Sequence, residues 1–243
     1  MNRSIEAYDE PDRIASYDSD MEVMHPNRSR MARVALEILP FDRQQPLVAL
    51  DLGSGTGYFT HRFLEEFPKG RVICVDGAQA MIDLAKVRLG TLVSRADFRL
   101  GDFRGLGDLL RPDETGFLAF SSYALHHLDP AEKRHVLERV RTFLRPGGWF
   151  LNADLIAADD QLLENQIQRL RVDGIVRRAA GKDPRFIDAD STRQFLRHIE
   201  TRDGDQPVSV LRDLRILEEA GFHHPSVLWL EYREAVTAAR IED

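Results

Sequence analysis

Three glycines on alternate positions stand between an apolar run and an amphipathic stretch of this chain. The run ends at Leu52, Gly53, Gly55 and Gly57 follow, and a helical pattern begins at Tyr58. A tight turn alone does not need three glycines, but glycine also lets a ligand approach the backbone without a Cβ in the way. A buried strand that leads through such a loop into a helix predicts an open α/β sheet with a ligand site at its carboxyl edge.

Short apolar runs alternate with amphipathic stretches from about residue 47 to 155. Most runs are continuously apolar, as central strands are, whereas 96–100 alternates and is expected nearer an edge. The clearest helix, 130–144, starts with Asp129 as N-cap, Pro130 at N1 and Glu132 completing a capping box. Strands separated by helices predict a mostly parallel sheet with right-handed crossovers. The runs are 47–50, 72–75, 96–100, 117–120 and 149–151.

Two segments lie outside this alternation. Residues 1–45 contain one expected helix at about 26–39, and an insert follows the fifth strand at 157–206, with a helix around Leu162, Leu163, Ile167 and Leu170. A further helix, 207–220, is ended by Gly221, and short strands near 226–230 and 234–239 form an antiparallel pair at one sheet edge. We therefore expect an N-terminal arm or lid (1–45), a core (46–156), a helical cap insert (157–206), and the last helix and strands of the core (207–243).

Acidic residues follow the second and third strands. Asp76 ends the second strand, where a carboxylate can hold both hydroxyls of a ribose, and Asp102-Phe103 follows the third. Asp102 can accept a hydrogen bond from an adenine amine, and the Phe103 N–H can reach an adenine ring nitrogen. The glycines do not follow the dinucleotide pattern, because Tyr58 stands at the third glycine position of that pattern. The sequence therefore predicts a site that binds a nucleoside but is not an NAD site.

The net charge and the cysteine content limit which binding partners and which cellular compartment we expect. With 33 Lys and Arg against 40 Asp and Glu the net charge is −7, so the chain has no general attraction to phosphate backbones or anionic lipid. No apolar run approaches the length of a membrane span, and the N-terminus lacks an apolar signal region. The single cysteine, Cys74, excludes an internal disulfide and a cysteine-based zinc site. We expect a cytoplasmic protein with no membrane or nucleic-acid partner.

The motifs together resemble those of the class I S-adenosylmethionine (SAM)-dependent methyltransferases. The stretch 51–57 is similar to their first motif, Asp76 and Asp102-Phe103 to the next two, 120–128 to their fourth-strand motif, 144–148 to the turn before strand five, and 219–222 to the end of the last helix. The resemblance implies SAM as cofactor and a Rossmann-like, seven-stranded sheet with an antiparallel last strand. Ser121 and Ser122 are expected to border the methionine end of SAM. The implied cofactor-binding residues are Asp51, Gly53, Ser54, Gly55, Gly57, Asp76, Gly77, Asp102, Phe103, Ser121 and Ser122.

The outer segments resemble a narrower branch. Tyr8-Asp9 and 13–18 are similar to the N-terminal arm of small-molecule methyltransferases of the quinone-biosynthesis type, whose arms fold over the cofactor. The insert, with Asp205 and Pro207 before the last helix, is similar in length and layout to that of the carboxy-SAM synthase of tRNA modification. There the insert helps to pair subunits and brings an arginine to the cofactor. This resemblance implies a homodimer through 157–206, a carboxylated cofactor as an alternative to SAM, and Arg197 as that arginine.

The acceptor side carries weaker signals. Methyl transfer from a sulfonium is an in-line displacement in which a general base is optional. His126 and His127 are the candidate catalytic bases, although the pair also occurs in the family for structural reasons. We expect no metal, because adjacent side chains point apart and no Cys or further His has metal spacing. Asp154 ends the fifth strand and is expected to face the cleft. Tyr8 and Tyr17 are candidates for a lid, and Trp229 and Tyr232 for the far wall of the site. For each of these aromatic residues the alternative is packing in the core or at an edge.

Three classes of function remain open. The first is a methyltransferase for a small-molecule acceptor at an O, N or C atom. The second is a tRNA-linked enzyme, which either methylates RNA or makes a modified cofactor for it. The third is a non-catalytic SAM-binding module. The balanced charge of the insert and the lack of a basic track with interleaved aromatic residues favour the first class.

Overall fold

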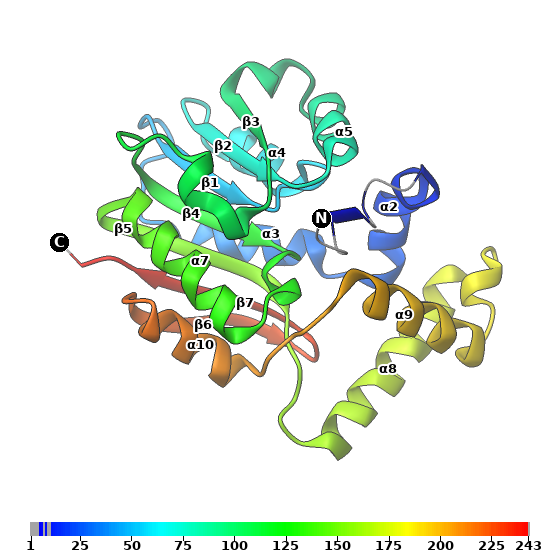
Figure 1. Cartoon of the computed structure of the whole chain (residues 1–243). Coiled ribbons are helices and arrows are strands. Elements are labelled where there is room, and N and C mark those ends of the chain that lie inside the picture. The colour runs from blue at the N-terminus through cyan, green and yellow to red at the C-terminus, as the bar shows by residue number, and fades with distance from the viewer. Residues whose placement is uncertain (1–4, 7, 9–10, 243) are drawn as a thin grey trace.

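The computed structural model describes residues 5–6, 8 and 11–242, built around a seven-stranded sheet (Figure 1). The strand order is β3-β2-β1-β4-β5-β7-β6. β1 to β5 are parallel, and β7 runs antiparallel to both β5 and β6. The predicted fold class, the edge position of the third strand and the C-terminal antiparallel pair are therefore confirmed. The strands are β1 Val48–Leu52, β2 Arg71–Asp76, β3 Ala96–Leu100, β4 Gly116–Ser122, β5 Leu144–Leu155, β6 His223–Glu231 and β7 Glu234–Arg240.

Helices cover both faces of this sheet. α3 (Arg28–Glu37) and α4 (Tyr58–Glu66) pack on one face, and α6 (Leu106–Leu109), α7 (Pro130–Phe143) and α10 (Val210–Glu219) pack on the other. Because side chains alternate along a strand, Ala49 and Leu50 enter opposite cores. α5 (Gln79–Leu89) lies beside α4. Among the residues described, no helix is long and apolar enough to cross a membrane.

Capping residues define where two of the helices begin or end. Asp129 accepts hydrogen bonds from the backbone N–H groups of Ala131 and Glu132, and the Glu132 side chain completes the capping box of α7. Gly221 ends α10 with a φ of 85°, a value that favours glycine. Short 3₁₀ segments complete the core and cap: η1 Gly90–Arg95, η2 Phe103–Gly105, η3 Leu125–His127 and η4 Pro184–Phe186.

A small second core holds the cap together. It joins α2 (Pro11–Met24), α8 (Gln161–Ala179), η4 and α9 (Ala189–Asp203), which extend from one end of the sheet (Figure 1). The sequence indicated α8 and, at 28–37, α3, but not α2 or α9. α2 has no clear sequence signal, because its buried positions include Arg13 and Asp20. These two charged side chains form ion pairs with Asp203 and Arg185. Its apolar pattern is correspondingly weak.

Candidate functional site

The glycine loop turns sharply between β1 and α4. Gly53, Gly55 and Gly57 have φ between 51° and 73°, which L side chains rarely adopt. The N–H groups of Gly53 and Ser54 both donate to the Val75 carbonyl of β2, at 2.9 and 3.1 Å. A Cβ on Gly53 would lie 2.4 Å from the Cβ of Ala124. The loop is thus held against two strand ends while Gly55 keeps open space beside it.

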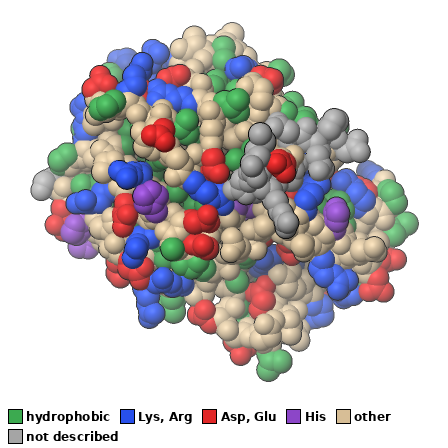
Figure 2. Space-filling view, viewed as in Figure 1, with side chains coloured by type: hydrophobic (Ala, Val, Ile, Leu, Met, Phe, Trp, Pro, Cys, Tyr) green, Lys and Arg blue, Asp and Glu red, His purple; other side chains and the backbone are tan. Residues whose placement is uncertain are grey.

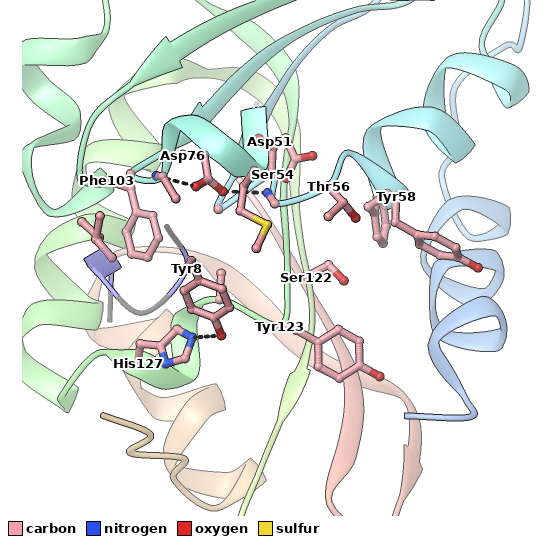
Figure 3. A pocket seen from close by; sticks show the side chains of 18 of the residues that line it. Tyr8, Asp51, Ser54, Thr56, Tyr58, Asp76, Phe103, Ser122, Tyr123 and His127 are labelled. Atoms are coloured by element: carbon pink, nitrogen blue, oxygen red, sulfur yellow. Dashed lines mark hydrogen bonds between the residues drawn. The ribbon is translucent and has the colours of Figure 1, made fainter. Parts of the chain in front are cut away.

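Asp76 connects that loop to the end of β2. One carboxylate oxygen accepts the N–H of Gly55 at 2.7 Å, and the other accepts the N–H of Ala78 at 2.9 Å (Figure 3). The side chain is buried at the wall of a cavity. Asp76 therefore shapes the loop in addition to facing the space in which the sequence predicts a ribose.

A main cavity lies over the carboxyl ends of the strands. Most of the predicted cofactor residues line it: Asp51, Gly53, Ser54, Gly55, Asp76, Gly77, Asp102, Phe103 and Ser122. Gly57 and Ser121 do not. Gly57 faces α5, where an added Cβ would lie 3.0 Å from that of Ala85. Ser121 is fully buried and its hydroxyl donates to the Leu52 carbonyl at 2.9 Å, because successive strand residues point to opposite faces.

Two further acids border this cavity in different electrostatic settings. Asp51 is buried, and burial raises its pKa to about 7 although the Thr60 hydroxyl donates to it at 2.5 Å. Asp102 lies at the rim, where its carboxylate is 3.3 Å from the Arg104 guanidinium. At neutral pH Asp51 is thus close to its titration midpoint, so that a cation nearby would favour its ionised form.

The N-terminal arm supplies part of the cavity wall. Tyr8 and Tyr17 line it, with ring centroids 6.0 Å apart. Asp18 of α2 accepts hydrogen bonds from the Thr56 hydroxyl at 3.1 Å and from Arg28 at 3.0 Å, and it also pairs with Arg88. The arm is therefore attached directly to the glycine loop. Further lining residues that sequence reasoning did not single out are Ile5, Arg28, Thr56, Tyr58, Phe59, Ala78, Met81, Arg104, Tyr123 and Ala124.

The two predicted histidines lie side by side, so the expectation that their side chains point apart is wrong. Their ring centroids are 4.1 Å apart in the 3₁₀ turn η3, and both rings approach Asp205. His126 Nδ1 lies 2.6 Å from Asp154, which is buried behind it rather than facing the cleft. His127 lines the main cavity, and its Nε2 is 3.4 Å from the Tyr8 hydroxyl (Figure 3).

The pKa values of the two histidines shift in opposite directions. Burial disfavours the charged form of both rings, but the carboxylates of Asp154 and Asp205 outweigh it at His126 and raise that pKa. At His127, burial and the adjacent His126 lower the pKa. The His127 ring is therefore neutral at pH 7 and carries hydrogen on one nitrogen.

A second cavity adjoins the main one beneath the cap. Tyr8, Tyr17 and Tyr123 line both. Tyr123 has a φ of 51°, a strained value for an aromatic residue, and its hydroxyl donates to Glu234 at 2.7 Å. His25 Nδ1 lies 3.1 Å from the same carboxylate. The remaining lining residues come mainly from α2, α8 and α9: Arg13, Met21, Met24, His25, His126, Leu155, Arg171, Ile199, Glu200, Asp203 and Asp205.

Three candidates lie away from both cavities. Trp229 packs on the sheet core beneath the Arg30 guanidinium, and Tyr232 is 58% exposed at the β6–β7 turn. Arg197 is on the exposed side of α9 and does not reach the main cavity. The implied arginine contact with a carboxylated cofactor stays a prediction.

Comparisons with known proteins agree on one family. Residues 49–148 match a family described as a methyltransferase domain. An uncharacterized methyltransferase of Geobacillus kaustophilus is 29% identical over 175 residues, covering 71% of this chain and 70% of that protein. A malonyl-[acyl-carrier protein] O-methyltransferase of Acetivibrio thermocellus is 28% identical over 170 residues, but the match spans only 57% of either chain.

A solved structure extends the likeness across the fold. The DhpI complex with SAM and HEP is 22% identical, with a TM-score of 0.64, and the match covers 98% of this chain and 96% of that one. The methyltransferase-domain match runs from β1 into β5 and so includes the glycine loop and both acidic motifs. Motif, fold and relatives agree that the chain is a methyltransferase that uses S-adenosylmethionine.

Proposed function

We propose that this methyltransferase modifies a small molecule held in the second cavity. The observation that carries the proposal is the shared wall of Tyr8, Tyr17 and Tyr123, which places the second cavity directly beyond the main one. With SAM in the main cavity, its methyl group would face these tyrosines. In-line transfer then needs an acceptor positioned near the methyl carbon with water excluded, which a space covered by the cap supports.

The second cavity suits a polar acceptor. Its walls carry charged side chains that are already paired, with Arg13 3.2 Å from Asp203 and Arg171 2.5 Å from Glu200. An acceptor there meets balanced charge rather than a strongly cationic surface. Outside the cavity, Figure 2 shows basic and acidic side chains intermixed on the face in view. This distribution favours a small molecule over RNA, because RNA binding relies on a continuous basic surface.

We assign different roles to the two histidines. His127 borders the main cavity beside the Tyr8 hydroxyl, which keeps its proton because burial raises the pKa of Tyr8 well above its usual value. We expect the paired His127 and Tyr8 side chains to border the acceptor at this junction. His126 acts through position: its backbone N–H and ring both bind Asp154, which holds the loop after β4 in place.

We propose that the arm and the insert act together as a lid. Met24 of the arm packs with Val172, Ile175 and Leu196 of the insert in one small core. Arg185 of the insert also pairs with Asp20 of the arm at 2.6 Å. Opening one segment would therefore disturb the other, so both are expected to move when the acceptor enters.

We also propose that two subunits pair through the insert. On α8, Leu162 is 76% exposed and Leu163 is 54% exposed, although both are large apolar side chains. Pairing would remove this surface from water. Light scattering should give a dimer mass for the wild type and a monomer mass for the double variant Leu162→Ser, Leu163→Ser, and a wild-type monomer would contradict the proposal.

Label transfer tests the acceptor class. Purified protein is incubated with SAM carrying a labelled methyl group and, separately, with a low-mass metabolite fraction or with total tRNA. We expect label in a low-mass product and none in tRNA, and none with the Gly55→Val variant as control. Label in tRNA would favour the tRNA-linked alternative, and SAM binding without any transfer would favour the binding module.

A further inference from the structure

Three potential metal ligands converge where the cap meets the loop after β4. His126 and His127 come from η3, and Asp205 comes from the segment between α9 and α10. Nε2 of His126 and Nδ1 of His127 lie 3.6 and 3.1 Å from the same oxygen of Asp205. One ligand atom of each residue lies within 4.8 Å of those of the other two.

Two of these three atoms lack a well-aligned hydrogen bond. Nδ1 of His127 and Oδ1 of Asp205 are both buried and lie 3.1 Å apart, but their geometry is not that of a well-formed hydrogen bond. They are close to each other, but the ring nitrogen does not aim a hydrogen at the oxygen. His127 as a whole is 8% exposed and Nδ1 itself is buried, so bulk water does not reach that nitrogen. Buried polar atoms in this condition normally have a partner, because an unmade bond costs about 1–3 kcal/mol.

The surroundings orient the ligands as they do in metal sites. Nδ1 of His126 binds the Asp154 carboxylate at 2.6 Å, which directs Nε2 toward Asp205. Nε2 of His127 faces the Tyr8 hydroxyl, which leaves Nδ1 for a ligand. A carboxylate on the far nitrogen of a ligating histidine is the usual means of fixing its tautomer. The backbone N–H of Gln206 donates to the His126 carbonyl at 2.7 Å and so anchors the segment that carries Asp205.

We propose that His126, His127 and Asp205 bind one divalent ion of the zinc class. Two imidazoles and one carboxylate form a ligand set that zinc accepts, and bond lengths near 2.0–2.2 Å place tetrahedral ligands roughly 3.4 Å apart. The distances from Asp205 to the two ring nitrogens, 3.6 and 3.1 Å, lie on either side of that value.

The position of the site gives the ion access to an acceptor. His127 lines the main cavity, while His126 and Asp205 line the second. Three protein ligands leave a fourth coordination position open, as catalytic zinc sites do. The binding proposal itself does not depend on which acceptor the enzyme uses, and it goes beyond methyl transfer to a small molecule.

Zinc binding can be measured without knowing the acceptor. The full chain is freed of metal with a chelator, dialysed, and titrated with Zn²⁺ by calorimetry, and Co²⁺ absorption reports the ligand geometry. We expect one equivalent of Zn²⁺ to bind, Asp205→Asn and His127→Asn to weaken it more than about a hundredfold, and Asp154→Asn to weaken it by about 10- to 100-fold. S-adenosylhomocysteine binding by Asp205→Asn confirms that the variant is folded.

The chain offers a matched control. His223 and His224 are also adjacent, and Glu242 lies 3.4 and 3.6 Å from their ring nitrogens, but this group is exposed. His224→Ala should leave zinc binding unchanged. The proposal is overturned if the wild type takes up no more zinc than Asp205→Asn, or if His224→Ala removes the bound zinc.

Discussion

Replacing Asp76 by alanine should weaken cofactor binding and loosen the glycine loop together. The carboxylate accepts the N–H groups of Gly55 at 2.7 Å and Ala78 at 2.9 Å. With cofactor bound, we expect it also to accept hydrogen bonds from the ribose. Losing one charge-assisted pair to the ligand costs about 1.5–3 kcal/mol, which corresponds to an increase in Kd of about 13- to 160-fold.

The loop contributes a separate effect on stability. Both backbone N–H groups lose their partner in Asp76→Ala, but Gly55 borders the main cavity, where water can replace the carboxylate. We therefore expect a fall of about 1–3 kcal/mol in the free energy of unfolding, arising chiefly at Ala78. Urea unfolding without ligand measures this fall, and calorimetry with S-adenosylhomocysteine measures the affinity.

A matched variant separates the local effect from the loss of one negative charge. Asp83 lies on α5, close to Asp76 in sequence, but it is exposed and accepts from the Gln79 and Lys86 side chains. Asp83→Ala should change neither affinity nor stability appreciably, because such surface pairs contribute little. If Asp76→Ala binds S-adenosylhomocysteine within about twofold of the wild type, the carboxylate does not contact the cofactor and the assignment of β2 to the ribose fails.

Three further variants or conditions test other parts of the site. Gly55→Val should abolish S-adenosylhomocysteine binding in calorimetry, because valine is strained at a φ of 51° and its side chain would enter the main cavity. The pKa of Asp51 is raised to about 7, so in the protein without ligand this carboxyl is mostly protonated at pH 6. The ammonium group of bound S-adenosylhomocysteine would favour the ionised carboxylate. The affinity for S-adenosylhomocysteine should therefore rise about tenfold from pH 6 to pH 8, and Asp51→Asn should remove that rise. Limited proteolysis should cut the arm more slowly with S-adenosylhomocysteine present, and equal rates would contradict a cofactor-linked lid.

The half of the site that binds cofactor was predictable because its signals are local. Gly53, Gly55 and Asp51 are within a few residues of one strand end, and Asp76 and Asp102 follow the next two strands. Parallel strands bring such ends to one edge of the sheet, so the order of the elements is enough to place them together. The side chain of Ser121 was placed wrongly because one residue along a strand reverses the face to which it points.

The proposed acceptor half depends on contacts between distant segments. Glu234 binds His25 and Tyr123 although they are 209 and 111 residues away in the chain. No periodicity marks Glu234 and His25, because both side chains are polar and hydrogen-bond each other where they are buried. The geometry of the two histidines was missed for the same reason: Asp205, toward which both turn, follows them by more than seventy residues.

If the second cavity holds the acceptor, as proposed, this division also locates specificity. The methyltransferase-domain match covers residues 49–148. It begins after the arm and ends before the insert, so it covers the cofactor half alone. Every lining residue of the second cavity, apart from Tyr123 and His126, lies outside that match. Tyr123 and His126 belong to the loop after β4. His126 faces Asp205 at the end of the insert, and Tyr123 donates to Glu234 of β7. On this proposal, a chain can keep the donor site constant and change its acceptor by altering the arm and the insert, provided that the loop after β4 keeps its carboxylate partners.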